Sequence, residues 1–334
     1  MHLAGATMIG GARTAHNTLL RLLAALAQLL RGLIVVPLMA RSFGPESYGL
    51  FAAALSLVSI GRTLIWNVGP VLTAAIVREP GREAVLLRGA AREIAACAVV
   101  LWLAFGGIAV GWYHDRSAVV LVLVLGVSLF TDVVALRGAS LSARAQEGAL
   151  TVFQTVASLT SVAAVVVVCK LGGGTRAIAA AFALCALLHA VLIARASARV
   201  APAPAPAAQA TRHLVLRLAA PALFINLAGA LSSNVDLVLL GHWSGAVALG
   251  SYAAASRMLG VGMLLPNAVA AAAVPALAAD RARGLERCIR VTALLGFVAI
   301  PVAAFAGFYA PAAPWLLGRS YAAATALVPL LAGR

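Results

Sequence analysis

The sequence predicts an all-α, polytopic integral membrane protein with two helical lobes, and three observations support this. Hydrophobic residues make up 63% of the 334 residues, charged residues only 10%, and the mean hydropathy is +1.01, all far from a soluble globular chain. Apolar runs of about 20 residues, the length that crosses a bilayer as a helix, recur along the chain. Most of the 25 Lys and Arg residues fall in alternate gaps between these runs.

We expect about ten transmembrane segments, because each run approaches the ~20 residues that a span needs. They are expected near residues 18–40, 48–70, 93–112, 117–137, 150–170, 177–197, 215–240, 249–275, 291–310 and 320–334. A helix from Arg319 to Arg334 rises only ~24 Å of a ~30 Å core, so we expect a truncated or fragmentary chain. A last helix that begins near Pro311 would instead span completely. The first run is long and follows a polar stretch, so it is expected to stay as an anchor.

The arginine pattern predicts the orientation, because cytoplasmic loops keep basic residues and translocated loops lose them. The sparse gaps hold only Arg41, Arg116, Lys170, Arg176 and Arg319. The crowded gaps hold Arg13, Arg21, Arg78, Arg82, Arg88, Arg92, Arg137, Arg144, Arg195, Arg199, Arg212, Arg217, Arg281, Arg283, Arg287 and Arg290. We therefore expect a multi-pass protein of the cell inner membrane with a cytoplasmic N-terminus.

The net charge of +15 would suggest nucleic acid as a partner of a soluble protein. Here the basic residues follow the topology and favour anionic lipid headgroups, so membrane lipids are expected as partners and nucleic acid is not. The cysteines at 97, 169, 185 and 288 show no CxxC spacing, so neither a disulfide framework nor a zinc site is indicated. No metal or other cofactor is expected.

An Ala/Pro-rich stretch marks the predicted domain boundary, since such a sequence favours an extended, solvated form. We expect a six-helix N-terminal lobe at 1–200, a cytoplasmic linker at 201–213 and an incomplete C-terminal lobe at 214–334. An even number of spans before the linker gives both lobes the same orientation, as in parallel transporter repeats. The segment 78–92 is either a short amphipathic helix on the inner surface or a solvated loop.

Ionisable residues inside the spans are the candidate functional residues, because a charge at mid-membrane costs at least ~2.5 kcal/mol by insertion scales. On the first helix, Gln28 and Arg31 share a polar face with Asn17 and Arg21. Lipid offers these groups no hydrogen bonds, so the face is expected to turn inward. Arg21 snorkels to the inner interface in the simplest interpretation, whereas Arg31 lies too deep and is assigned to a cavity.

Arg62, near the middle of the second span, is the best single candidate for an anion site. Its fork of donors matches phosphate geometry, so Arg31, Arg62 and Gln28 are predicted to bind substrate, with two inward arginines holding a diphosphate. The competing interpretation is a structural bond from Arg62 to backbone carbonyls or to a carboxylate on a neighbouring helix. Asp132, near the inner end of the fourth helix, is expected to be neutralised by Arg137, Arg88 or Arg92.

Asp236 and Arg257 are predicted to form an ion pair across the outer hairpin. Each lies about five residues from that hairpin, so both are expected within ~7–10 Å of the outer interface. A structural role is expected for the pair, and a role in gating or proton coupling is the alternative. No catalytic residue is assigned.

Four stretches resemble the polysaccharide or O-antigen (Wzx-type) flippases of the multidrug/oligosaccharidyl-lipid/polysaccharide exporter superfamily. They are Leu38-Met-Ala-Arg-Ser-Phe-Gly-Pro-Glu-Ser-Tyr-Gly-Leu-Phe51, Val235-Asp-Leu-Val-Leu-Leu-Gly241, Gly250-Ser-Tyr-Ala-Ala-Ala-Ser-Arg-Met258 and Leu317-Gly-Arg-Ser-Tyr-Ala-Ala-Ala324. Similar proteins have twelve to fourteen helices. Asp236 and Arg257 match the family's acidic and basic positions. Gly44, Pro45, Tyr48 and Gly49 match its hairpin signature rather than a substrate contact.

The resemblance implies that an undecaprenyl-diphosphate-linked oligosaccharide is moved from the inner to the outer leaflet by alternating access of two lobes. The implied partners are this polyprenyl-diphosphate-linked glycan and other polysaccharide-assembly proteins. The alternatives are a lipid II flippase, a cation-coupled multidrug antiporter and a non-transporting scaffold of glycan assembly. An antiporter predicts an acidic cavity, whereas Arg31, Arg62 and Arg257 outnumber the intramembrane aspartates.

An enzyme is not expected, because the 10 Asp and Glu residues are scattered along the chain. An ATP-driven pump is not expected either. The only lysine, Lys170, lies in Val-Cys-Lys-Leu-Gly, and the sequence contains no GxxxxGK[ST] loop that would bind the phosphates.

Overall fold

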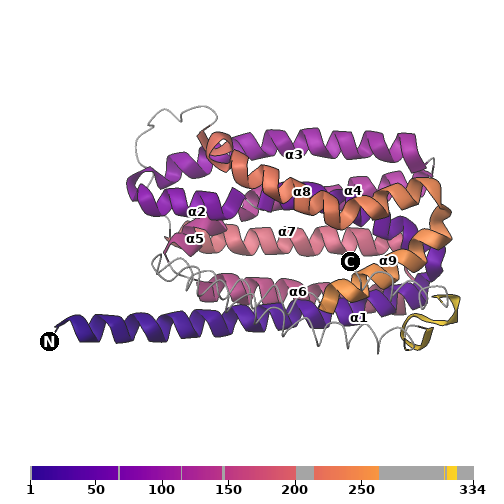
Figure 1. Ribbon diagram of the computed structural model, residues 1–334, viewed down its shortest axis with the longest axis horizontal. Helices are drawn as coiled ribbons and strands as arrows, with labels where there is room; N and C mark the ends of the chain where they lie inside the picture. The colour runs from indigo at the N-terminus through magenta and orange to yellow at the C-terminus, as the bar shows by residue number, and fades with distance from the viewer. Residues whose placement is uncertain are drawn as a thin grey trace, which may run out of the picture. The chain divides into compact units, whose positions relative to one another are not determined.

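The computed structural model describes residues 2–66, 68–113, 115–144, 147–200, 214–262, 312 and 314–321, and every regular element in these ranges is helical, as predicted (Figure 1). The helices are α1 (His2–Trp66), α2 (Val68–Arg78), η1 (Pro80–Arg82), α3 (Glu83–Tyr113), α4 (Arg116–Ala135), α5 (Gly138–Ala143), α6 (Glu147–Lys170), α7 (Thr175–Val200), α8 (Leu214–Trp243), α9 (Gly245–Gly262) and η3 (Arg319–Tyr321).

The 65 residues of α1 are two helices joined at a kink, because Gly44 has φ 70° and ψ 173°. A side chain with a Cβ rarely adopts such a backbone conformation, so glycine is required at this corner. Helix α9 also begins at a glycine with positive φ, Gly245 (φ 75°). The chain therefore has a glycine of positive φ both before the second part of α1 and at the beginning of α9.

Six helical stretches among the described residues are long and apolar enough to cross a membrane. They are Leu26–Arg78, Glu83–Tyr113, Arg116–Ala143, Gly148–Lys170, Thr175–Arg199 and Leu223–Trp243. The first is 53 residues long, and the kink at Gly44 divides it between the first two predicted spans. The chain is thus a multi-pass membrane protein. The predicted count of about ten spans stays a prediction, since 291–310 and most of 320–334 lie outside the described residues.

The basic segment between the second and third spans differs from both of its predicted forms. It is neither a separate surface helix nor a loop, because α3 already begins at Glu83 and continues unbroken through residues 83–113. Only the η1 turn separates α3 from α2. The Glu83 carboxylate is buried, with its side chain 5% exposed, and it accepts a 2.8 Å hydrogen bond from Nη2 of Arg144. This ion pair connects the first turn of α3 to the residue that follows α5.

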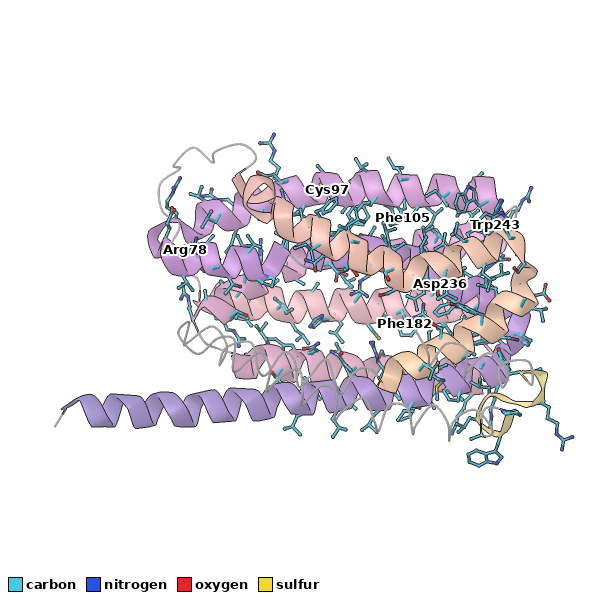
Figure 2. The ribbon with its side chains drawn as sticks, in the orientation of Figure 1. Arg78, Cys97, Phe105, Phe182, Asp236 and Trp243 are labelled. Carbon is cyan, nitrogen blue, oxygen red and sulfur yellow. The ribbon has the colours of Figure 1, made fainter. Side chains whose placement is uncertain are left out.

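Contacts divide the chain into two compact units, which are Met1–Gly44 with Ser251–Arg334 and Pro45–Gly250. We call them the first and the second unit. The predicted lobes, 1–200 and 214–334, stay a prediction, and the linker at 201–213 lies outside the described residues. In the second unit α4 packs against α3 and α7, and α7 also packs against α5 and α6. Arg78 and Trp243 mark opposite ends of this unit (Figure 2).

Close packing between α3 and α4 depends on one glycine. The indole Nε1 of Trp102 donates a 3.0 Å hydrogen bond to the Leu123 carbonyl of α4. A Cβ on Gly126 would overlap this indole ring. The small residue lets the two helices approach, and the indole N–H is satisfied within an apolar helix pair.

A second close contact joins the beginnings of two helices in the second unit. A Cβ on Gly49 would lie 2.8 Å from the backbone nitrogen of Gly250, and one on Gly250 would lie 2.9 Å from Cα of Pro45. The atoms approached are backbone atoms, which cannot rotate away. Pro45–Gly49 and Ala246–Gly250 therefore form a small-residue crossing, of the kind that lets membrane helices approach most closely.

Helix α4 begins at a side-chain cap, and this cap gives a first testable prediction. The Asp115 carboxylate accepts a 2.7 Å hydrogen bond from the backbone N–H of Ser117. Replacing Asp115 with alanine removes this acceptor and is expected to lower stability by about 1 kcal/mol. Thermal unfolding of the purified protein in detergent measures the effect. Asp115→Asn, which keeps an acceptor, is the control, and an alanine variant as stable as the asparagine variant contradicts the prediction.

Candidate functional site

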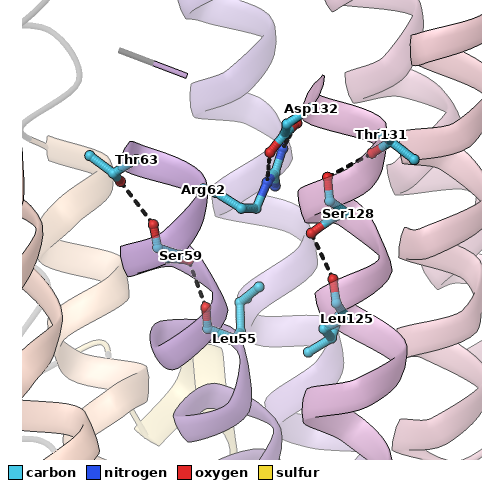
Figure 3. A network of polar contacts seen from close by, with 8 residues as sticks. All are labelled: Leu55, Ser59, Arg62, Thr63, Leu125, Ser128, Thr131 and Asp132. Carbon is cyan, nitrogen blue, oxygen red and sulfur yellow. Dashed lines mark hydrogen bonds and ion pairs between the residues drawn. The ribbon is translucent and has the colours of Figure 1, made fainter. Parts of the chain in front are cut away.

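An ion pair between Arg62 and Asp132 lies among the helices of the second unit (Figure 3). Arg62 belongs to the part of α1 that follows the kink, and Asp132 belongs to α4. Nε of Arg62 donates to Oδ2 of Asp132 at 2.7 Å, and Nη2 donates to Oδ1 at 3.0 Å. Two parallel charge-assisted bonds of this kind fix the orientation of the guanidinium as well as its position.

The two partners differ in exposure, and Arg62, the more exposed one, keeps donors that Asp132 does not use. The Asp132 side chain is 6% exposed, whereas the Arg62 side chain is 42% exposed. Asp132 uses the Nε–Nη2 edge of the guanidinium. The other edge, formed by Nη1 and the second Nη2 hydrogen, makes no hydrogen bond with any residue that the structure describes. Arg62 can therefore hold a second anion while it stays bonded to Asp132, because a guanidinium offers five N–H donors.

The hydroxyl groups around the pair bond to their own helices. Ser59 and Thr63 donate to the carbonyls of Leu55 and Ser59, at 2.6 and 2.9 Å. On α4, Ser128 and Thr131 donate to the carbonyls of Leu125 and Ser128, at 2.6 and 2.8 Å (Figure 3). Ser59, Ser128 and Thr131 are thus satisfied within their own helices, so they add local polarity without competing for Arg62.

Tight packing and a third titratable side chain complete the surroundings of Arg62. A Cβ on Gly61 would lie 2.7 Å from the Phe105 ring of α3 and 3.1 Å from Leu129 of α4, so the Arg62 backbone is held close to both helices. His189 of α7 interacts electrostatically with Arg62 and with Asp132. The site thus combines charged or titratable groups from α1, α4 and α7.

The prediction for the partner of Asp132 was wrong. Arg137, Arg88 and Arg92 were expected because they lie toward the inner end of the bundle, but Asp132 bonds to Arg62. Of the two interpretations of Arg62, the structure contains the bond to a carboxylate on a neighbouring helix. Binding of an anion to Arg62 stays a prediction, and the guanidinium edge that Asp132 does not use is compatible with it.

Gln28 and Arg31 lie on the part of α1 that precedes the kink, in the first unit. Gln28 is half-buried and Arg31 is exposed. They are three residues apart and share a helix face, as the sequence predicts. Arg62 belongs to the second unit, so a pocket that unites all three residues stays a prediction.

The Asp236–Arg257 pair also stays a prediction, because Asp236 belongs to the second unit and Arg257 to the first. Asp236 lies on α8 (Figure 2), and its Oδ1 accepts a 2.8 Å hydrogen bond from the backbone N–H of Leu237. Arg257 lies on α9 and is half-buried.

Sequence reasoning missed the contacts between the ends of α3 and α8. The Tyr113 hydroxyl donates to the Val238 carbonyl at 3.3 Å, and the His242 ring lies 5.2 Å from the Trp112 ring. A Cβ on Gly241 would lie 2.8 Å from the Tyr113 ring, so a glycine at this position lets α3 and α8 approach closely. The sequence did carry a signal for these contacts, because the aromatic residues Trp112 and Tyr113 lie at the end of the third span, where such residues mark the membrane interface.

Within the described ranges, no group of three or more His, Cys, Asp or Glu side chains lies close enough together to hold a metal ion.

Two solved structures share this architecture. The lipid II flippase MurJ, in an inward closed conformation, superposes with a TM-score of 0.73 at 14% identity, over 93% of this chain and 71% of that chain. An inward-facing multidrug resistance MATE transporter of the MOP superfamily gives a TM-score of 0.66 at 16% identity, over 94% of this chain and 79% of that chain. At these identities the similarity concerns the fold, so the chain is a membrane protein that shares the fold of these two proteins.

The chain belongs to the polysaccharide biosynthesis protein family, which matches residues 38–326. This match confirms the family that the four sequence motifs predicted. No curated protein sequence matches the chain significantly.

Proposed function

We propose that the chain flips an undecaprenyl-diphosphate-linked oligosaccharide across the cytoplasmic membrane by alternating access, in polysaccharide or O-antigen biosynthesis. Membership of a polysaccharide biosynthesis family and the fold shared with MurJ and the MATE transporter both support this proposal. A carrier of this kind needs a site inside the membrane for the charged part of its cargo, because an unpaired charge is costly there.

The edge of Arg62 that makes no hydrogen bond with the described residues is the observation that carries the proposal. Asp132 holds the guanidinium in a fixed orientation through Nε and Nη2, which leaves the Nη1 side with donors to spare. A phosphate oxygen pair matches this edge in the same way as a carboxylate. Arg62 then contacts the diphosphate of the cargo, and Asp132 acts as a positioning residue that keeps the fork turned toward it.

The remaining site residues receive roles consistent with their chemistry. Arg31 adds a second cationic contact to the diphosphate, and Gln28 on the same face donates or accepts hydrogen bonds from the attached sugar. Asp236 and Arg257 form an ion pair that stabilises one conformation of the carrier. The chain requires no cofactor, and its partners are the lipid-linked glycan, membrane lipids and other proteins of polysaccharide assembly.

Surface glycan in a strain that lacks its own flippase tests the proposal. Arg62→Lys keeps the positive charge but loses the planar fork, so we expect about tenfold less surface glycan than with the wild-type chain at equal expression. Arg92→Lys, at an exposed position of α3, is the matched control and is expected to behave as wild type. Equal glycan from Arg62→Lys and wild type rejects Arg62 as the diphosphate contact. Failure of the wild-type chain in every glycan system tested rejects the transport proposal itself.

Transport of lipid II is the second candidate, favoured by the TM-score of 0.73 with MurJ. Lipid II also carries a diphosphate, so the same edge of Arg62 serves both cargoes. Growth of cells depleted of their lipid II flippase distinguishes the two. Rescue of growth by this chain, without restored surface glycan in the first strain, favours lipid II.

A further inference from the structure

A groove on the surface of the second unit lies between α4 and α7. It has a volume of about 460 Å³, within the range of small-molecule sites, ~300–1,000 Å³. Its α4 side is formed by Val127, Phe130, Thr131 and Val134, which recur at helical spacing. The hydroxyl of Thr131 already donates to the Ser128 carbonyl, so this side presents apolar surface.

The α7 side is built from alternating large and small residues. Leu187 and Val191 are the large apolar residues of this side, and Ala190, Ala194 and Ala198 follow one another at four-residue spacing. Alanine side chains are short, so they leave space beside the larger residues. The lining of α7 runs from 187 to 198, which is ~16 Å of helix. The result is an apolar channel along this part of α7.

One cation lies in the last turn of helix that lines this channel. Arg195 lines the groove, is exposed, and makes no hydrogen bond or ion pair with any other residue in the described part of the chain. It lies near the C-terminal end of α7. In the topology predicted from the arginine pattern, that end faces the cytoplasm, where anionic lipid headgroups concentrate.

We propose that the groove between α4 and α7 binds one acyl chain of an anionic phospholipid, with the headgroup phosphate on Arg195. The apolar channel matches a linear hydrocarbon tail, and the Arg195 cation matches a phosphodiester. Nothing in this proposal depends on the cargo of the carrier, since Asp132 and Arg62 do not line the groove. The lipid fills the surface between the two helices and so supports their packing.

Photocrosslinking tests the site with the full chain in nanodiscs. The probe is phosphatidylglycerol with a diazirine in its acyl chain, diluted into phosphatidylethanolamine, and the crosslinked residues are mapped by mass spectrometry. We expect labels to concentrate on Val127, Val134, Leu187 and Val191, with about fivefold less labelling when the probe lipid is phosphatidylethanolamine. Equal labelling of exposed valines on α3, such as Val100 and Val110, overturns the proposal.

Two variants, each with a control, distinguish binding of the acyl tail from binding of the headgroup. Ala194→Phe fills the channel and is expected to remove the concentrated labelling, whereas Ala180→Phe, at an exposed position of α7 outside the groove, leaves it unchanged. Arg195→Gln is expected to abolish the preference for phosphatidylglycerol, and Arg199→Gln, its neighbour outside the groove, keeps it. Displacement of the label by polyprenyl diphosphate at concentrations where phosphatidylglycerol does not compete assigns the groove to a prenyl tail and overturns the phospholipid assignment.

Discussion

Gly250→Ala is expected to destabilise the protein strongly. The added Cβ would overlap the carbonyl of Pro45, and its neighbours there are backbone atoms that no side-chain rotation can move. The two helices must separate, and overpacking of this kind costs about 1–3 kcal/mol. Helix propensity alone predicts the opposite sign, since alanine is favoured over glycine by about 1 kcal/mol in a helix interior. The loss of thermal stability in detergent therefore measures the helix crossing itself.

Gly229→Ala is the matched control. Gly229 lies within α8, and a Cβ there would meet nothing within 4 Å. This variant is expected to be as stable as wild type or more stable. A Gly250→Ala protein that unfolds at the same temperature as Gly229→Ala would show that the crossing is looser than its backbone distances indicate.

Arg62→Ala is expected to lower the stability of the protein more than the removal of any other single charge in the second unit. It leaves the Asp132 carboxylate, 6% exposed, without the two hydrogen bonds that it accepts. Breaking a buried pair in this way costs about 3 kcal/mol, at the lower end of the usual range because Arg62 is partly exposed. Asp132→Ala is expected to cost less, because the 42% exposed guanidinium that remains reaches polar surroundings more easily.

The double variant makes this prediction specific. Arg62→Ala combined with Asp132→Ala is expected to unfold at a higher temperature than Arg62→Ala alone, because no charge is then buried without a partner. Arg82→Ala is the control, since its ion pair with Glu79 is exposed on both sides and is expected to contribute close to nothing. Additive losses from Arg62→Ala and Asp132→Ala would contradict a direct coupling between the two side chains.

Much of the architecture follows from length, composition and arginine spacing. Spans such as 117–137 and 150–170 coincide with α4 and α6 within a few residues, because apolar runs of bilayer length have one stable solution in lipid. The predicted beginning of the third helix, near residue 93, was wrong, since α3 begins at Glu83. Whether a helix continues through a basic segment depends on a tertiary contact that the sequence does not show. The Glu83–Arg144 ion pair holds that first turn, and its partners are 61 residues apart.

The candidate site was predictable only in part. Depth in the span identified Arg62 and Asp132 as unusual, since ionisable groups are rare at those positions. Their pairing depends on the rotation of two helices about their axes, which helical periodicity does not determine without a known neighbour. Proximity to the inner end favoured Arg137, Arg88 or Arg92 as the partner of Asp132. The packing of the helices places Arg62 against it instead.

Under the proposed function, the Arg62–Asp132 pair also bears on how transport responds to voltage. Its two charges cancel, so the pair itself carries no net charge across the electric field. A bound diphosphate adds more negative charge than Arg31, the one further cation assigned to the site, neutralises. With a potential negative inside, each such charge gains ~2.3 kcal/mol per 100 mV on leaving the cytoplasmic side. Under the proposed function, the membrane potential drives the loaded carrier outward and leaves the return of the empty carrier unopposed.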